Sequence, residues 1–218
     1  MRDAEVCRID EPDMTPEMDA SIRRLLCVCF PKDAEAFSQR RAWHDCVPAY
    51  SLVAWSGVYH RPMDGVSATT PPDCTPDTAA ASAPFASAPL ATELSGVVGH
   101  VAIVIREIRC GGASVTVAGV QSLAVAPDFR GTGLSRRLMT EAMDEAKRRG
   151  IAFGLLFCVP GLESFYASLG WIRTDEAVTM RDKEGRPVPI PASNIAMFKP
   201  LGSTPFPTGP IDLRGRDW

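Results

Sequence analysis

Residues 125–139 read VAPDFRGTGLSRRLM, and the fold can be worked out from this stretch outward. Pro127 ends an apolar run, Arg130 and two glycines follow, and an amphipathic segment begins at Leu134. Apolar residues recur at 134, 138, 142 and 146, which predicts a helix over 134–149 that ends at Gly150. The stretch therefore joins a strand to a helix through a glycine turn. Such a turn is typical either of a phosphate cradle or of a plain tight turn.

The composition excludes several classes of protein. The 218 residues include 23 Lys and Arg against 26 Asp and Glu, and the net charge of -3 argues against a general nucleic-acid binder. The seven cysteines are scattered, without a CxxC pair, so we expect reduced thiols and neither a disulfide framework nor a metal site. The N-terminus lacks an apolar signal segment, and the longest apolar run, 96–105, is too short to span a membrane. These features predict a cytoplasmic protein that binds no metal and enters no membrane.

The pattern of apolar residues predicts an α+β fold. Strands are expected at residues 4–9, 49–55, 95–109, 114–126, 151–159, 171–181 and 194–201, and helices at 15–29, 33–46, 134–149 and 162–170. The Gly-Gly turn within 110–113 makes the two longest strands an antiparallel hairpin. We expect a single domain over 1–218, with a mostly antiparallel sheet of about six to seven strands flanked by helices.

Two segments depart from this pattern. Residues 61–95 are rich in Pro, Ala and Ser with few large apolar side chains, which predicts a disordered or loosely tethered insertion. A lid or a substrate-selecting loop is the alternative, because long loops are often functional. The tail, 200–218, is rich in Pro and Gly but carries large apolar residues such as Leu213 and Trp218, so we expect it to pack on the body.

The glycine turn gains weight from what surrounds it. It follows a strand, opens a strong amphipathic helix, and precedes an apolar strand and the segment FYASLGW, residues 165–171. Residues 96–172, and 120–137 most specifically, resemble the GNAT superfamily of acyl-CoA-dependent N-acyltransferases. The resemblance implies the GNAT fold with acetyl-CoA as co-substrate. It also implies that the strand before the turn binds the pantetheine arm and that the turn holds the pyrophosphate. The implied pantetheine residues are Leu123, Ala124 and Val125, and the implied phosphate residues are Arg130, Gly131, Thr132, Gly133, Leu134 and Ser135.

A narrower resemblance concerns the acceptor. FYASLGW and the tail IDLRGRDW, residues 211–218, are similar to the corresponding segments of the aminoglycoside 2′-N-acetyltransferases. In those enzymes acidic tail residues and the terminal carboxylate help to receive a polycationic sugar. The resemblance assigns that role to Asp212, Asp217 and the carboxylate of Trp218. Where those enzymes carry a Glu on the strand before the turn, this chain has Gln121, whose amide cannot take a proton but can orient a water.

Acyl transfer defines the other roles that the chain must fill. A neutral amine attacks the thioester directly, and the oxyanion of the tetrahedral intermediate needs a donor, which we place at a backbone N–H near Leu123. Tyr166 lies where the family has its general acid. A phenol is a weaker acid than a thiol by roughly 1.5 pKa units, so this proton transfer depends on positioning. A half-buried aromatic that anchors the helix is the structural alternative for Tyr166.

The acceptor side leaves more alternatives open. His44 and Asp45 are either a base and substrate contacts or solvated polar residues beside Trp43. His100, Cys158 and Trp171 are expected in the core. The sequence thus predicts an N-acetyltransferase for a small-molecule amine, with an aminoglycoside or another aminosugar first. Another small amine, a protein amine, and a catalytically silent acyl-CoA-binding module remain alternatives, and the assembly, including a homodimer, stays open.

Overall fold

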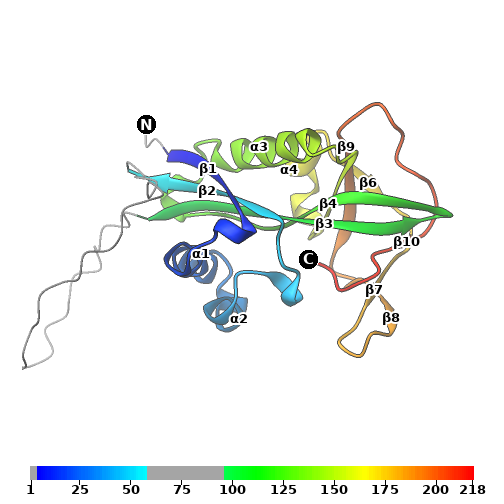
Figure 1. Cartoon of the computed structure of the whole chain (residues 1–218), viewed down its shortest axis with the longest axis horizontal. Helices are drawn as coiled ribbons and strands as arrows, with labels where there is room; N and C mark the ends of the chain where they lie inside the picture. Colours follow the sequence, from blue (N-terminus) through cyan, green and yellow to red (C-terminus); the bar gives the residue numbers. More distant parts are fainter. Residues whose placement is uncertain (1–3, 58–95) are drawn as a thin grey trace, which may run out of the picture.

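The computed structural model describes residues 4–57 and 96–218 as one curved sheet with helices on both faces (Figure 1). The insertion predicted at 61–95 lies outside the described residues. The α+β class of the sequence prediction is confirmed. No helix within the described ranges is long and apolar enough to cross a membrane.

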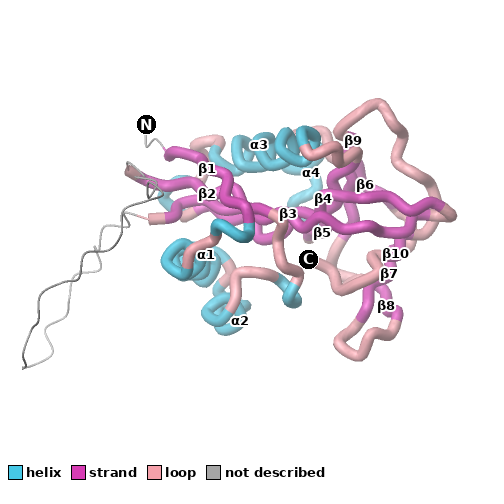
Figure 2. The backbone as a smooth tube through the Cα atoms, viewed as in Figure 1, coloured by secondary structure: helices cyan, strands magenta, loops and turns pink. Residues whose placement is uncertain are grey.

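The sheet has ten strands in the described part of the chain, more than the six to seven predicted (Figure 2). They are β1 (Ala4–Asp10), β2 (Tyr50–Ser56), β3 (Val97–Cys110), β4 (Ala113–Val125), β5 (Phe153–Cys158), β6 (Ile172–Thr174), β7 (Val178–Arg181), β8 (Pro187–Pro189), β9 (Ile195–Pro200) and β10 (Ile211–Asp212). Their order is β6-β9-β5-β4-β3-β10-β7-β8, with β2 and then β1 added beside the first half of β3. The pairs β4–β5 and β10–β7 are parallel and the other pairs are antiparallel.

The β3–β4 hairpin is the backbone of the sheet, as its long apolar runs predict. Gly111 takes a left-handed φ of +57°, and a Cβ there would lie 2.4 Å from the carbonyl oxygen of Thr208, so only glycine fits this turn. β4 pairs with β5 over three residues alone, from Val117–Phe153 to Gly119–Leu155. Beyond that point the two strands separate. The resulting opening between them is where the cavities described below lie.

The four α-helices of the described chain are α1 (Pro16–Cys29), α2 (Ala34–Gln39), α3 (Leu134–Arg148) and α4 (Glu163–Ala167). Helices α1 and α2 lie on one face of the sheet and α3 on the other (Figure 1). Helix α1 begins where its sequence predicts, because the Thr15 hydroxyl accepts a hydrogen bond from the Met18 N–H (3.3 Å). Leu138, Met139 and Ala142 of α3 are buried against the sheet, as the helical period predicts.

The predicted helix over 33–46 is wrong beyond Gln39. The chain becomes extended at Arg40 (φ -151°), and the buried guanidinium of Arg41 pairs with Asp19 (3.0 Å) and with Glu11. These long-range ion pairs replace the last helical turns. A single 3-10 turn, η3 (Trp43–Asp45), follows.

The predicted strand over 171–181 is also wrong, because it is two strands. β6 pairs with β9 near one edge of the sheet, whereas β7 pairs with β8 and β10 at the other. Glu176, between them, accepts a hydrogen bond from the Gly209 N–H (2.9 Å). The tail supplies β10, and its residues Leu213 and Trp218 are buried.

Candidate active site

The glycine turn forms the entrance to a cavity of about 280 Å³ beside β4 and α4. Five of the nine residues assigned to the coenzyme by resemblance line it: Leu123, Ala124, Val125, Arg130 and Ser135. Gly131, Thr132 and Gly133 are exposed in the turn itself. The side chain of Leu134 is buried in the core, so only its backbone is available to a ligand.

The backbone of the turn explains its glycines. Gly131 (φ +76°) and Gly133 (φ +86°) are left-handed, and a Cβ on either would meet nothing within 4 Å. Glycine is therefore required by conformation, and the space above the turn is open. The N–H groups of the first turn of any helix have no acceptor within the helix. Gly133, the residue that caps α3, has no side chain that could accept a hydrogen bond from them. An uncapped helix N-terminus of this kind suits a pyrophosphate.

A β-bulge precedes the coenzyme segment of β4. His100 pairs with Ala124 and Ala102 with Gln121, so Ser122 and Leu123 together oppose Val101. Ser122 has a left-handed φ of +56°. The fully buried His100 holds the bulge in place, because its Nδ1–H donates to the Ser122 carbonyl (3.0 Å) while Nε2 accepts from the Ser51 hydroxyl (3.3 Å). Burial lowers the pKa of His100 to about 3, so the ring is neutral. The sequence prediction of a core position for His100 is confirmed.

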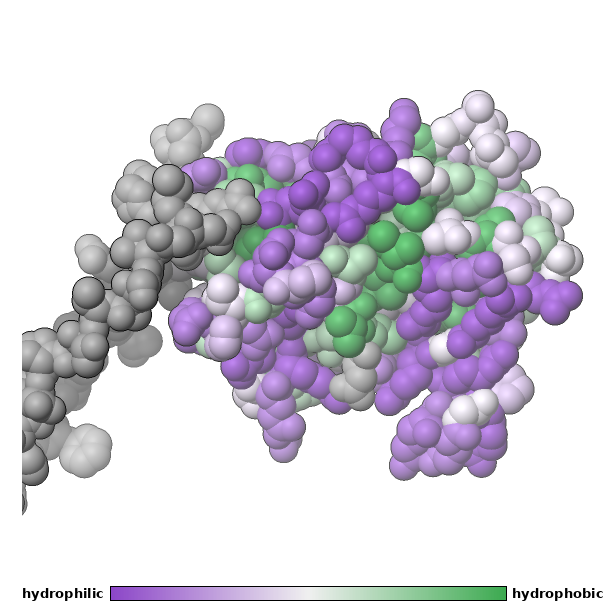
Figure 3. Space-filling model, viewed as in Figure 1, coloured by the Kyte–Doolittle hydropathy of each residue, from purple (hydrophilic) through white to green (hydrophobic). Residues whose placement is uncertain are grey.

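A second, larger cavity of about 450 Å³ continues from the first. Phe30, Leu123, Leu162 and Tyr166 line both cavities. The larger one, called here the acceptor cleft, is also lined by Asp33, Trp43, His44, Val120, Gln121, Ser122, Leu156, Phe157, Cys158, Val159, Pro191, Ser193, Asn194, Asp217 and Trp218. Among the described residues, this lining holds two carboxylates and no Lys or Arg. On the face shown in Figure 3, hydrophobic side chains gather across the middle, between hydrophilic ones over α1, α2 and the β7–β8 hairpin.

Tyr166 lies at the junction of the two cavities. Its ring packs edge-on against Phe165 (5.0 Å between centroids) and Trp171 (6.3 Å), and only 7% of the residue is exposed. Burial raises the pKa of Tyr166 well above its ordinary value of 10, so the phenol is protonated at neutral pH. The neighbouring Cys158 thiol has its pKa raised by burial to about 11 and is protonated too. Tyr166 therefore presents a proton where the two cavities meet.

Gln121 is buried and its amide joins β4 to the η3 turn. Oε1 accepts from the Trp43 N–H (2.9 Å) and Nε2 donates to the Cys46 carbonyl (2.7 Å). Both atoms of the amide are thus bonded to the backbone on either side of His44. The contacts place Gln121 as a brace for this turn.

The tail closes the far wall of the acceptor cleft. Asp217 and Trp218 both line it, and Asp217 Oδ1 lies 2.7 Å from Nδ1 of His44. Trp218 packs against Phe157 (5.5 Å between centroids) and lies under the Arg106 guanidinium (4.9 Å). The indole rests on Gly119 of β4, where a Cβ would approach it to 2.2 Å.

Asp212, which was also assigned to the acceptor, does not join this group. Asp212 pairs with Arg181 (2.7 Å) and accepts from the Arg214 N–H (2.9 Å), and it lines neither cavity. The Arg181 hydrogen bond holds the pKa of Asp212 below its usual value. The backbone of Asp45 belongs to η3, but its side chain lies outside the described part of the structure.

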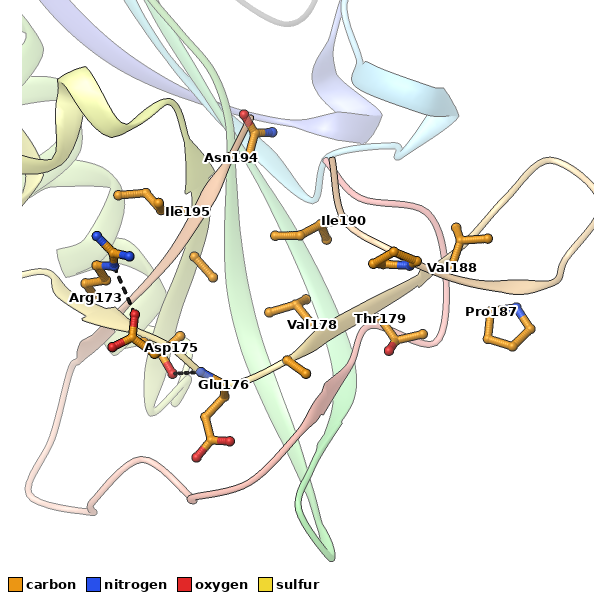
Figure 4. Close-up of a pocket in the computed structure, with 14 residues that line it drawn as sticks. Arg173, Asp175, Glu176, Val178, Thr179, Pro187, Val188, Ile190, Asn194 and Ile195 are labelled. Atoms are coloured by element: carbon orange, nitrogen blue, oxygen red, sulfur yellow. Dashed lines mark hydrogen bonds and ion pairs between the residues drawn. The ribbon is translucent and has the colours of Figure 1, made fainter. Parts of the chain in front are cut away.

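A further cavity of about 510 Å³ lies between β6–β9 and the β7–β8 hairpin (Figure 4). Asn194 lines both this cavity and the acceptor cleft. Its walls are largely apolar, with Val178, Val188 and Ile190 facing it, and its one guanidinium, Arg173, is paired with Asp175 (3.1 Å). This cavity extends the acceptor side of the molecule away from the coenzyme turn.

Comparison with known proteins identifies this architecture. The chain superposes on the GNAT family N-acetyltransferase YhbS of Escherichia coli, solved in complex with CoA, with a TM-score of 0.58 at 18% identity over 96% of this chain and 89% of that one. It is a GNAT fold. Two further solved structures share the fold: Escherichia coli ElaA (TM-score 0.53, 12% identity) and an acyl-CoA N-acyltransferase from Pseudomonas aeruginosa (TM-score 0.52, 12% identity). Each match covers 90% of this chain and 99% of the other.

The sequence comparisons point to the same superfamily. Residues 88–173 match the family described as "Acetyltransferase (GNAT) domain". An uncharacterized N-acetyltransferase, ycf52-like, of Prochlorococcus marinus is 40% identical over 63 residues, which is 29% of this chain. That match spans only 35% of the length of the curated relative. The GNAT resemblance of the sequence analysis is therefore supported at the level of the superfamily.

His44 is the residue of the site that sequence reasoning left undecided. Its carboxylate partner, Asp217, lies 173 positions away, and none of the sequence neighbours of His44 predicts that pairing. The signal that the sequence did offer was the assignment of Asp217 to the acceptor side.

Proposed function

We propose that the protein is an N-acetyltransferase that transfers an acetyl group from acetyl-CoA to a primary amine. The observation that carries the proposal is the meeting of two cavities at Leu123 and Tyr166. One opens at an uncapped helix N-terminus suited to phosphates, and the other is an acidic cleft suited to a cationic amine. A donor and an acceptor bound in these cavities would meet beside a protonated phenol.

On the donor side, the turn 130–135 would hold the pyrophosphate through backbone N–H groups, and Arg130 would add a positive charge. Leu123, Ala124 and Val125 would hold the pantetheine arm. β4 has no β5 partner beyond Gly119, so backbone groups on that side of the strand are free of sheet pairing to β5. The oxyanion donor is placed among them, near Leu123.

The bound co-substrate supplies a thioester carbonyl that a neutral amine can attack. Tyr166 is the group of this chain that would protonate the departing sulfur, because it reaches both cavities and stays protonated at neutral pH. Its raised pKa makes it a weak acid, so the phenol must be held close to the sulfur to act.

On the acceptor side, Asp33 and Asp217 attract an ammonium group, and the rings of Phe30, Trp43 and Trp218 suit a cation or the face of a sugar. Aminoglycosides and other aminosugars are therefore our first acceptors. We propose Asp217 and Trp218 as acceptor-binding residues because both line the cleft, and we leave out Asp212, which is paired with Arg181. A different small amine or a protein amine is the second choice.

The proposal is tested by mixing the purified protein with acetyl-CoA and a panel of aminosugars, polyamines and amino-terminal peptides, and by following thiol release. Turnover with at least one amine, together with micromolar binding of CoA by calorimetry, is the expected result. Tight CoA binding without turnover of any amine would favour the silent acyl-CoA-binding module instead. Failure to bind CoA would refute both functions.

A further inference from the structure

The acceptor cleft of the proposed enzyme needs a group that takes a proton. A primary amine is an ammonium ion at neutral pH and has no lone pair with which to attack. Gln121 cannot accept that proton, and both atoms of its amide are already bonded to the backbone of the η3 turn. Tyr166 and Cys158 are protonated and can only donate. The proton must therefore pass either to bulk water or to a base on another element of the cleft.

We infer that His44 is the general base for the acceptor amine and that Asp217 is its positioning residue. This inference rests on the proposed acetyl transfer and deepens it. Because a carboxylate only accepts hydrogen bonds, the 2.7 Å contact places the proton of the neutral ring on Nδ1. Nε2, which bonds to none of the described residues, is then the basic nitrogen of a ring that lines the cleft. In the resulting order of amine, imidazole and carboxylate, the carboxylate fixes the tautomer of the ring and stabilises the imidazolium.

The backbone at His44 is held in an uncommon conformation. Its φ of +46° and ψ of +34° are left-handed, a conformation that only a few per cent of non-glycine residues adopt. Gln121 fixes Trp43 on one side of it and Cys46 on the other, and the Cys46 thiol donates to the Asp217 carbonyl (3.2 Å). Three contacts thus hold a strained turn in one place, and strain of this kind concentrates at functional sites.

The carboxylate partner is fixed as firmly as the ring. Only 9% of the Asp217 side chain is exposed, against 33% for His44, so the carboxylate is shielded while the ring remains accessible. Trp218 is seated on Gly119, and Arg106 donates to the Arg216 carbonyl just before Asp217. The tail is thereby attached on both sides of the carboxylate.

The charges around the ring favour this role. Asp217 from the tail and Asp33 at the start of α2 are the carboxylates of the described cleft, and Cys158 of β5 and Tyr166 of α4 are neutral. The guanidinium of Arg106, on β3, is turned to Trp218 and the tail backbone. A cationic amine therefore meets negative charge on approach, and an amine that bears a carboxylate is disfavoured.

The proton balance of the step closes. The ammonium proton passes to Nε2 of His44 as the nitrogen forms its bond to the acetyl carbon. The carbon–sulfur bond breaks and the thiolate takes a proton from Tyr166. The second proton that the nitrogen loses in becoming an amide reaches the Tyr166 phenolate through water, and the imidazolium releases its proton to water. The net products are the acetamide, the free thiol of CoA and one proton.

The test is the pH dependence of kcat/KM in the wild type and in His44→Asn. Asparagine tolerates a left-handed φ but cannot act as a base, so the variant keeps the turn and loses the proton acceptor. At pH 7 we expect kcat/KM to fall by about 10²-fold or more, with the rate of the variant still rising with pH up to the pKa of the amine. CoA affinity should not change. If the wild type is active and His44→Asn has the same pH profile as the wild type, the inference is overturned and the proposed function stands.

The role of Asp217 is tested by rescue and by spectroscopy. Asp217→Asn should lower kcat/KM about tenfold or more, and Asp217→Glu should recover part of it. The chain has three histidines, so long-range ¹H–¹⁵N spectra of the single His variants assign the His44 ring without turnover. A proton on Nδ1 and a bare Nε2 at pH 8 are expected. A proton on Nε2 would overturn the inference, as would equal activity of the Asn and Glu variants.

Discussion

The donor and acceptor sides of the site are built from the chain in opposite ways. The cavity proposed for the coenzyme takes five of its ten lining residues from one continuous segment, 123–135, and the proposed phosphate contacts are backbone groups. The acceptor cleft draws Asp33, His44, Gln121 and Asp217 from four distant segments and relies on side chains. A local sequence motif can bind a ligand that is the same in every reaction. A specific acceptor needs side chains from distant parts of the chain, which only the tertiary fold brings together. Substitutions that change one side of the site at a time test this division.

Among the tests of this division, the largest effect is expected at Tyr166, where the two sides meet. Tyr166→Phe removes the proton donor and keeps the packing of the ring, so kcat should fall by roughly 10²-fold. CoA affinity, measured by calorimetry, should stay within threefold. Undiminished turnover would show that the phenol is only an anchor for α4.

A smaller loss is expected when the acceptor side is disturbed through Gly119. A Cβ there would lie 2.2 Å from the Trp218 indole, so Gly119→Ala should displace the tail and with it Asp217. Misplacement of such a group costs about 10- to 100-fold in kcat/KM, while CoA binding should persist. Gly112→Ala, where a Cβ meets nothing, is the matched control. Equal loss of CoA affinity and activity would contradict the division into two sides.

The donor side is disturbed through Gly133. Alanine at a left-handed φ of +86° costs about 1–2 kcal/mol, which we expect to appear as an approximately tenfold weaker affinity for CoA. The KM of the amine should change little. Gly202→Ala, at an open position with an ordinary φ, serves for comparison. If Gly133→Ala raised the KM of the amine and left CoA affinity unchanged, the turn would not be the phosphate site.

The smallest effect is expected at His100, which holds the β-bulge of β4 between the donor and acceptor sides of the site. Its folded pKa of about 3 lies below the unfolded value of about 6.5, so the unfolded chain binds the extra proton between these values. Stability is therefore fully present above pH 6.5 and is lost as the pH falls below it, by up to about 1.4 kcal/mol per pH unit. Urea midpoints at pH 7, 6 and 5 measure this slope. His100→Gln should flatten it, and parallel slopes in the two proteins would show that His100 does not contribute.

The parts of the fold that the sequence predicted are local ones. The Gly111 turn, the amphipathic period of α3 and the glycine turn at its start each depend on residues within a few positions of one another. The predictions failed where distant residues override local preference. Arg41 leaves the helical pattern to reach Asp19 and Glu11, and nothing near Arg41 in the chain indicates this. The bulge at Ser122 likewise depends on His100, 22 positions away.

The site follows the same rule. Residues 123–125 and 130–135 were assigned from a resemblance to a motif, and five of these nine residues line one cavity. Asp212 and Asp217 were assigned together, but the structure separates them because Arg181 engages the first while the second reaches His44. The resemblance assigned both aspartates to acceptor binding, and only the path of the folded tail shows that Asp217 lines the cleft and Asp212 does not.

The short pairing of β4 with β5 also bears on how the protein resists aggregation. Beyond Gly119, β4 has strand partners on the β3 side alone, so the sheet contains an unpaired strand edge in its interior. Exposed edges of this kind invite pairing with another chain. Here the Cys29 thiol and the Arg130 guanidinium both donate to the Val125 carbonyl, and helices α1 and α4 flank the opening. A strand from another chain could pair along this edge only by displacing these two side chains, so the contacts at Val125 oppose self-association.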